Sequence, residues 1–226
     1  MASRPLLLGH RGARAVKAIP ENTSASFDLA LAHGCDGFEF DVRLAADGEA
    51  VVCHDAKTQE IEIARASAES LPHLPHLREV LARYQRRAFL DIELKVPGLE
   101  KITAKLLREF PPSAGYVVSS FLPEVLRAIH AEDSAIPLGL ICEITSQLDE
   151  WSRVPVTHVM IHQRLALLST IRALQSAGKK VVVWTVNGAR VMQRLAKWGV
   201  DGIVSDDTER LVRTLGPSQM DQNGKS

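Results

Sequence analysis

The sequence predicts an α/β fold, a (β/α)8 TIM barrel. Eight short apolar runs with strand character recur along the 226 residues, and longer amphipathic stretches separate them. Such alternation favours a parallel sheet, and eight units in 226 residues average about 28 residues each. That length fits an eight-stranded barrel better than a six-stranded doubly wound sheet.

The predicted strands are apolar at most positions, as strands between a barrel interior and a layer of helices must be. In chain order they cover residues 6–10, 38–42, 89–94, 116–121, 138–142, 158–162, 181–186 and 202–205. Apolar residues recur at helical spacing between them, over residues 23–33, 99–110, 123–131, 165–177 and 189–198. Asn22 or Thr23, after Pro20, is typical of the N-cap that begins the first helix.

A short β-hairpin arm is expected after the second strand. Asp47-Gly48 favours a two-residue turn, so that residues 51–54 fold back antiparallel on residues 38–43. This register places Asp41 opposite His54, with their Cβ atoms about 5 Å apart. A slip of one residue would break the pairing.

The domain organisation is expected to be simple. Residues 1–215 are predicted to form a single barrel domain, followed by a polar, disordered tail over residues 216–226. The segment 56–77 has little apolar periodicity and contains two prolines, which indicates a surface excursion. It is a reduced insertion before the third barrel strand.

Charge and hydropathy exclude several classes of partner. The 27 basic residues balance the 27 acidic ones, and no Lys/Arg-rich run suggests nucleic acid or a membrane surface. No apolar run approaches the roughly 18 residues that span a bilayer. The first strand begins by Leu6, which leaves no room for a cleaved signal peptide. We therefore expect a cytoplasmic protein without stable membrane insertion, whose partner is a small molecule.

The three cysteines do not form a recognisable motif. Cys35, Cys53 and Cys142 are odd in number, widely spaced and without a CxxC pair. Zinc binding and redox chemistry are therefore not expected, and we interpret the cysteines as buried free thiols.

Charged residues should face inward on two strands. Because side chains alternate between the faces of a strand, Glu39 and Asp41 share one face of residues 38–42. The same parity puts Asp91, Glu93 and Lys95 on one face of residues 89–95. The apolar residues between them occupy the opposite faces.

These residues fall at the carboxyl ends of their strands, where active sites of such barrels lie. Glu39, Asp41 and Glu93 would repel one another and resist burial unless a cation joined them. Ligands that are all oxygen suit a hard ion, so we predict one divalent cation, Mg²⁺, Ca²⁺ or Mn²⁺.

The same mouth holds bases and fixed positive charges. His10 and His54 can act as acid and base near neutral pH. Arg11 and Lys95 supply positive charge for an anionic substrate. The alternative is a self-neutralising network in which Arg11 and Lys95 pair with the carboxylates. It is the weaker interpretation, because buried ion pairs seldom add stability and do not call for two histidines.

Three further residues are candidates with structural alternatives. Trp184 is either core packing or a wall for the organic group of the substrate. Asp91, one layer below Glu93, is interpreted as a buried acid without an assigned role. His162 ends a strand and is more often, at such a place, a hydrogen-bonded structural residue.

Taken in order and spacing, these residues resemble the glycerophosphodiester phosphodiesterase family over residues 8–206. The resemblance is carried by His10-Arg11-Gly12, Pro20-Glu21-Asn22-Thr23, Glu39-Phe40-Asp41-Val42, Asp47-Gly48, His54-Asp55, Glu93-Leu94-Lys95, Ser120-Phe121, Trp184-Thr185-Val186-Asn187 and Gly199-Val200-Asp201-Gly202-Ile203. The chain departs from the family pattern after Asp55, where residues 56–77 replace a fuller insertion. That departure bears on the preference for a headgroup.

The resemblance implies hydrolysis of a glycerophosphodiester to glycerol 3-phosphate and an alcohol. It implies that His10 and His54 are the acid/base pair, that Arg11 and Lys95 contact the phosphate, and that three carboxylates bind the metal. The resemblance assigns these metal-binding positions to Glu39, Asp41 and Glu93. One histidine would deprotonate the glycerol 2-hydroxyl for attack on phosphorus, the other would protonate the leaving alcohol, and water would open the cyclic phosphate. Two alternatives stay open: a lysophospholipase D that accepts one acyl chain, and a barrel that only binds phosphodiester metabolites.

Overall fold

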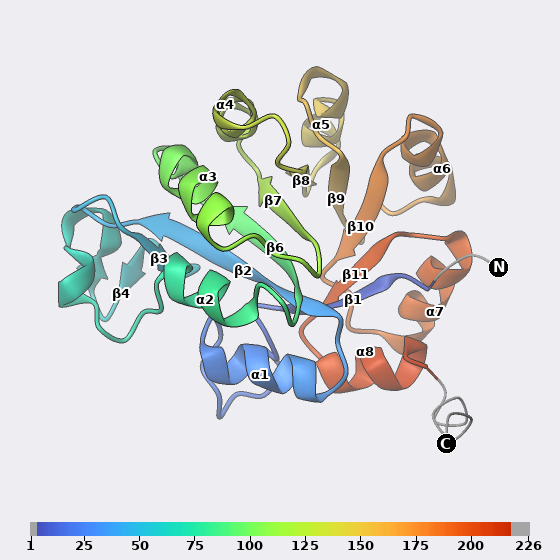
Figure 1. Ribbon diagram of the computed structural model, residues 1–226. Helices are drawn as coiled ribbons and strands as arrows, with labels where there is room; N and C mark the ends of the chain where they lie inside the picture. The colour runs from blue at the N-terminus through green and yellow to red at the C-terminus, as the bar shows by residue number, and fades with distance from the viewer. Residues whose placement is uncertain (1–3, 218–226) are drawn as a thin grey trace.

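The computed structural model describes residues 4–217, and within that range eight parallel strands close into a barrel (Figure 1). The first and second strands pair with each other, which closes the sheet. The barrel strands are β1 (Leu6–His10), β2 (Gly37–Leu44), β6 (Phe89–Leu94), β7 (Tyr116–Ser120), β8 (Leu138–Cys142), β9 (His158–His162), β10 (Lys180–Trp184) and β11 (Gly202–Ser205). The prediction of a TIM barrel is confirmed.

Helices surround the strands on the outside of the barrel (Figure 1). They are α1 (Ser24–Ala32), α2 (Leu77–Tyr84), α3 (Glu100–Glu109), α4 (Pro123–Glu132), α5 (Thr145–Leu148), α6 (Leu168–Ser176), α7 (Ala189–Trp198) and α8 (Thr208–Leu215). The sequence analysis predicted five of these and did not identify α2, α5 and α8. Thr23 is the N-cap of α1, since its side chain accepts a hydrogen bond from the backbone N–H of Ser26.

The strand parity expected for β2 is confirmed. Phe38 and Phe40 are fully buried on its outer face, where the ring of Phe27 from α1 stacks on Phe38 with centroids 4.2 Å apart. Tyr84 from α2 meets Phe38 edge-on at 5.0 Å. These contacts fasten the first helices to β2. They also leave its inner face free for polar side chains.

The hairpin arm forms, but its predicted register is wrong. The strand β3 (Ala50–Val52) pairs antiparallel with β2 so that Val42 lies opposite Val52. The connecting loop has three residues, 46–48, because the N–H of Ala45 donates to the carbonyl of Glu49 at 2.9 Å and Gly48 takes a φ of +83°. The extra loop residue puts Cys53, not His54, opposite Asp41.

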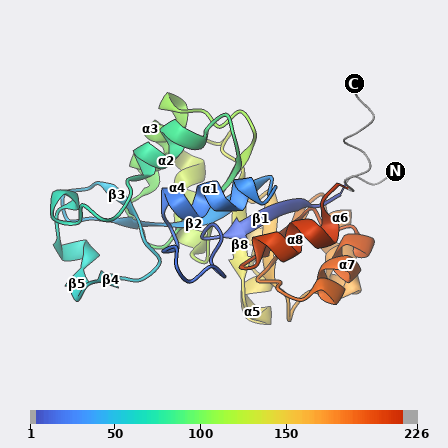
Figure 2. The ribbon, with the colours of Figure 1, turned by 90° about the horizontal axis from the view of Figure 1, so that it is seen from below.

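The segment after the arm is a surface excursion with short elements of its own. It contains β4 (Lys57–Thr58), β5 (Ile61–Glu62), and the 3₁₀ turns Ile63–Arg65 and Ala68–Ser70. Figure 2 shows it at the end of the molecule away from α6, α7 and α8. A small apolar cluster, which includes Val51, Ile63 and Leu71, holds it against the hairpin arm.

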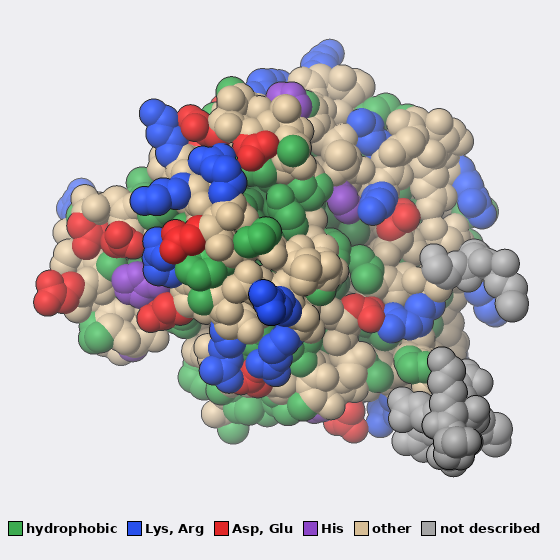
Figure 3. All heavy atoms as spheres, in the orientation of Figure 1, with side chains coloured by type: hydrophobic (Ala, Val, Ile, Leu, Met, Phe, Trp, Pro, Cys, Tyr) green, Lys and Arg blue, Asp and Glu red, His purple; other side chains and the backbone are tan. Residues whose placement is uncertain are grey.

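Basic and acidic side chains are interspersed over the face shown in Figure 3. Within the described range 4–217, none of the helices has the length and apolar character needed to cross a bilayer. The predicted tail lies, beyond Pro217, outside the described residues. The three cysteines are free, as expected, and Cys35 and Cys142 are buried; the interpretation as a buried thiol is wrong for Cys53, which is partly exposed.

Candidate active site

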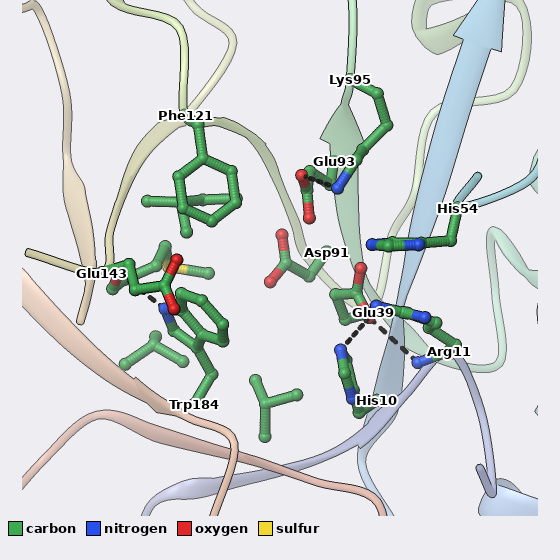
Figure 4. Close-up of a pocket in the computed structure, with 14 residues that line it drawn as sticks. His10, Arg11, Glu39, His54, Asp91, Glu93, Lys95, Phe121, Glu143 and Trp184 are labelled. Atoms are coloured by element: carbon green, nitrogen blue, oxygen red, sulfur yellow. Dashed lines mark hydrogen bonds and ion pairs between the residues drawn. The ribbon is translucent and has the colours of Figure 1, made fainter. Parts of the chain in front are cut away.

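A pocket of about 300 Å³ opens at the carboxyl ends of the strands and collects most of the predicted site residues (Figure 4). It is lined by His10, Arg11, Glu39, His54, Asp91, Glu93, Lys95, Phe121, Ile141, Glu143, Met160, Val182, Trp184 and Val204. Asp41, with 1% exposure, lies beneath this lining. The structure therefore brings all eight predicted residues to one place. His162 is not part of the lining, and its ring packs edge-on against Trp184 at 5.2 Å.

Three carboxylates form the most compact feature of the pocket. One oxygen each from Glu39, Asp41 and Glu93 lies within 4.8 Å of the other two. The register of the sheet causes this, since Asp41 on β2 lies beside Glu93 on β6 and Glu39 is two residues earlier on the same inner face. All three are buried. This acidic triad could hold a metal ion.

Two cations lie against part of the triad. Lys95 Nζ is 2.6 Å from Glu93 Oε1 and 3.3 Å from Asp41 Oδ1, and Arg11 Nε is 3.2 Å from Asp41 Oδ2. Burial alone would raise the pKa of Asp41, but the charges of Lys95 and Arg11 hold it below its usual range. The ion pairs of the alternative interpretation are thus present for Asp41 and Glu93.

Neither Lys95 nor Arg11 forms an ion pair with Glu39. Its Oε2 accepts the backbone N–H of Arg11 at 2.9 Å, whereas its buried Oε1 has no hydrogen-bond partner among the described residues. Burial and then the charges of Asp41 and Glu93 raise the pKa of Glu39 well above its usual range. The pKa of Glu93 is raised to about 7, mainly by burial. The ion pairs therefore leave the triad short of positive charge.

The turn after β1 aims Arg11 at the pocket. Arg11 and Gly12 both take positive φ, +52° and +82°. A Cβ at Gly12 would lie 2.6 Å from the carbonyl carbon of Ser26, so this close approach to α1 requires glycine. The turn also brings Asn22 inward, where its amide donates to Asp41 Oδ2 at 2.8 Å. The Arg11 guanidinium donates a hydrogen bond to Glu21 Oε1 at 2.7 Å, which completes the turn.

His10 is held by a carboxylate that the sequence analysis did not single out as a site residue. Asp206, directly after β11, lies with its Oδ1 2.7 Å from His10 Nδ1. Burial would raise the pKa of Asp206, but hydrogen bonds from His10 and Asn187 hold it far below its usual range. The ionised carboxylate keeps a proton on Nδ1 and leaves Nε2 directed at Glu39, 3.9 Å from its Oε2. The available signal was a carboxylate at the end of the strand that pairs with β1.

His54 reaches the pocket from the chain just beyond β3. Its side chain is 36% exposed, and its Nδ1 lies 2.8 Å from Asp55 Oδ1. Figure 4 shows His54 and His10 on the same side of the pocket, next to Arg11 and Glu39. Each histidine thus has a carboxylate at Nδ1, and within residues 4–217 neither Nε2 makes a hydrogen bond, although His10 Nε2 lies 3.9 Å from Glu39 Oε2.

The opposite wall of the pocket is largely apolar. Trp184 and Phe121 meet edge-on with ring centroids 5.7 Å apart. Ile141, Met160 and Val182 from the barrel interior continue this wall. Trp184 is partly buried; it packs against the apolar cluster of the barrel interior and also lines the pocket, so both of its predicted roles stay open. Glu143, which follows β8, also lines the pocket and was not identified from the sequence.

Comparisons with known proteins agree with this geometry. The model of the glycerophosphoryl diester phosphodiesterase family matches residues 10–105 and 68–210. A glycerophosphodiester phosphodiesterase of Caldanaerobacter subterraneus is 28% identical over 246 residues, covering 94% of this chain and 98% of that protein. An Oleispira antarctica phosphodiesterase, solved with the product sn-glycerol-3-phosphate, has a TM-score of 0.81 at 25% identity and covers 93% of this chain and 96% of its own.

A glycerophosphodiester phosphodiesterase of Agrobacterium tumefaciens shares the fold, with a TM-score of 0.81 at 24% identity over 92% of this chain and 99% of its own. The closed parallel barrel has a charged pocket at its carboxyl end, and the family model together with the relatives defines the chain as a barrel enzyme, a phosphoric diester hydrolase. It belongs to the glycerophosphoryl diester phosphodiesterase family.

Proposed function

We propose that this chain hydrolyses glycerophosphodiesters to glycerol 3-phosphate and an alcohol, with one divalent cation and with His10 and His54 as acid and base. One observation carries the proposal: the triad of Glu39, Asp41 and Glu93 lies at the same pocket as two histidines and two cations. Membership of the family supports the substrate class.

The chemistry of the triad fits a hard divalent cation. Its donors are all carboxylate oxygens, which suit Mg²⁺, Ca²⁺ or Mn²⁺. The buried Glu39 Oε1 lacks a partner among the described residues, as an oxygen meant for a metal would. A bound cation would offset the charge of the phosphate and polarise its oxygens.

The two histidines would divide the proton transfers. The Nε2 of one histidine accepts the proton of the glycerol 2-hydroxyl as that oxygen attacks phosphorus, and the other donates a proton to the oxygen of the leaving alcohol. The product of this step is a cyclic phosphate. Water then adds to phosphorus and the ring opens, which yields glycerol 3-phosphate. Asp206 and Asp55 keep the two rings oriented through their Nδ1 atoms.

Arg11 and Lys95 would bind the phosphate. Both side chains line the pocket, and both are largely buried, so their charges are weakly screened. A phosphate in the pocket would be a third anionic partner for each, since each already pairs with two carboxylates. Arg11 is fixed at its other end by Glu21, which preorganises its guanidinium.

The direct test is hydrolysis of glycerophosphoglycerol by protein stripped with EDTA and then supplied with Mg²⁺, Ca²⁺ or Mn²⁺, with release of glycerol 3-phosphate as the readout. We expect no turnover without metal and recovery with it. The Glu93→Gln variant should lose Mn²⁺ affinity in calorimetry by about 10-fold or more. Glu132→Gln, at the exposed end of α4, is the matched control and should bind Mn²⁺ normally.

Three results would count against parts of the proposal. Full turnover in a verified metal-free preparation would remove the cation from the mechanism. Binding of the diester without turnover would favour the non-catalytic barrel. Hydrolysis confined to lysophospholipids in micelles would favour the lysophospholipase D.

A further inference from the structure

The pocket has two chemically different halves. Figure 4 shows His10, Arg11, His54 and Lys95 on one side, and Phe121, Glu143 and Trp184 on the other. The first half matches the glycerophosphate part of a substrate, as proposed above. The second half faces the same pocket and has no role in the proton transfers.

We propose that Glu143, Trp184 and Phe121 form a subsite for a cationic headgroup of the quaternary ammonium class; this inference rests on the proposed phosphodiesterase function. A trimethylammonium group has an apolar surface that carries a positive charge. The faces of aromatic rings attract such a group through cation–π interaction, and a nearby carboxylate attracts it through its negative charge. The wall offers both kinds of partner.

The aromatic part of the wall is held in place. The indole N–H of Trp184, the only polar group of this side chain, donates to the carbonyl of Met160 at 3.0 Å and is thereby satisfied. Phe121 meets the Trp184 ring edge-on, and His162 packs against it from another side at 5.2 Å. Lys95 Nζ already lies 5.7 Å from the Phe121 centroid, so this ring is in cation–π geometry with a charge from the other half.

The carboxylate of Glu143 is uncommitted. Among the described residues no basic side chain pairs with it, in contrast to Asp41, Glu93 and Asp206, which each have a Lys or Arg partner. Its backbone N–H donates to Gln147 Oε1 at 2.8 Å, which ties the residue to the first turn after β8. Glu143 therefore puts one negative charge at an otherwise apolar wall, beside Trp184 in the pocket lining.

Two aromatic rings with one carboxylate suit a quaternary ammonium headgroup better than a polyol or an acyl chain. A polyol headgroup needs several hydrogen-bond partners, and the wall residues Ile141, Met160 and Val182 offer no polar side chain. An acyl chain would gain from the apolar wall but would meet the Glu143 carboxylate at its edge. The glycerol end needs the histidines and carboxylates of the opposite half.

The test compares glycerophosphocholine with its neutral isostere, the 3,3-dimethylbutyl ester of glycerophosphate, in which carbon replaces nitrogen. Size and shape are the same, and the leaving-group difference is common to all enzyme variants, so the change of the kcat/KM ratio from wild type to variant reports recognition of the charge. We expect the wild-type enzyme to favour the choline ester by roughly 10-fold. Glu143→Gln should lower that ratio to about 3 or less, and Glu143→Lys should bring it below one. Trp184→Leu should lower it as well.

The control is Glu132→Gln, which also removes one exposed carboxylate but lies at the end of α4, where the helix returns to the opposite end of the barrel. Its ratio should equal that of the wild type. A wild-type ratio within about twofold of one overturns the subsite, while hydrolysis of both esters upholds the proposed function.

If neither ester nor glycerophosphoglycerol is hydrolysed, the proposed function fails, and calorimetric titration with the two esters still decides the subsite. Equal affinity for both esters overturns it. A preference for the choline ester that Glu143→Gln removes supports it.

Discussion

Asp91→Asn should stabilise the metal-free protein, and the gain should grow with pH. Asp91 is 3% exposed on the inner face of β6, and its Oδ1 accepts a hydrogen bond from Ser119 Oγ at 2.6 Å. Burial raises the pKa of Asp91 from 3.8 to about 7, against that hydrogen bond and with the help of the charge on Glu93. Asparagine keeps the shape and the acceptor oxygen but never ionises.

The sign follows from proton linkage. The folded protein holds a proton at Asp91 up to about pH 7, whereas the unfolded chain releases it near 3.8. The contribution to stability is therefore fully present below 3.8 and is lost as the pH rises through about 7. At 1.36 kcal/mol per pKa unit, the full loss is about 4 kcal/mol. Between pH 5 and pH 8 the advantage of the variant should grow by about 3 kcal/mol.

The assay is thermal unfolding in EDTA at pH 5 and pH 8 for both proteins. For a domain of this size about 3 kcal/mol corresponds to roughly 6–12 °C in Tm. We expect the difference in Tm between the Asp91→Asn variant and the wild type to grow by an amount in that range from pH 5 to pH 8. Asp149→Asn, which changes an exposed carboxyl, is the control and should show no such trend. An advantage of Asp91→Asn that is equal at the two pH values would refute the reasoning.

The remaining predictions concern catalysis and the core. His10→Ala and His54→Ala should each lower kcat by about 10²- to 10⁴-fold with an unchanged far-UV spectrum; near-wild-type kcat in either variant would return that histidine to a structural role. Asp206→Asn should also lower kcat by about 10²-fold or more, with a smaller change in KM, because it loosens His10; a change in KM alone would contradict this. Phe27→Ala, at a side chain with 0% exposure, should cost about 3–5 kcal/mol in denaturant unfolding; a loss below about 1 kcal/mol would show that the aromatic cluster repacks.

Most of the fold could be predicted because its signals are local. Apolar runs identified all eight barrel strands, and strand parity correctly placed Glu39 and Asp41 inside with Phe38 outside. The helix α2 was missed because it begins at Leu77, the last residue of the segment taken as an excursion. The helical signal was nevertheless present in the sequence, because its four buried residues recur at helical spacing: Leu77, Val80, Leu81 and Tyr84.

The hairpin register shows how a local signal can mislead. Asp47-Gly48 suits a two-residue turn, yet the loop takes three residues. Pairings outside the turn compete with its own preference: the N–H of Val52 donates to the carbonyl of Pro75 at 2.8 Å, and Val51 is buried in the apolar cluster of the excursion. The preference of a turn for one register amounts to little beside such burial.

The sequence by itself determined the barrel, the inward acids and the family, because strand parity and motif spacing depend only on neighbouring residues. Only the tertiary structure decided which partners these residues meet. Closure of the barrel brings Asp206 to His10 across 196 positions of the chain. The same closure sets Glu143 across the pocket from the histidines. Contacts between residues so far apart in the sequence leave no periodic signal, because the pairing of the strands determines them and the intervening residues do not.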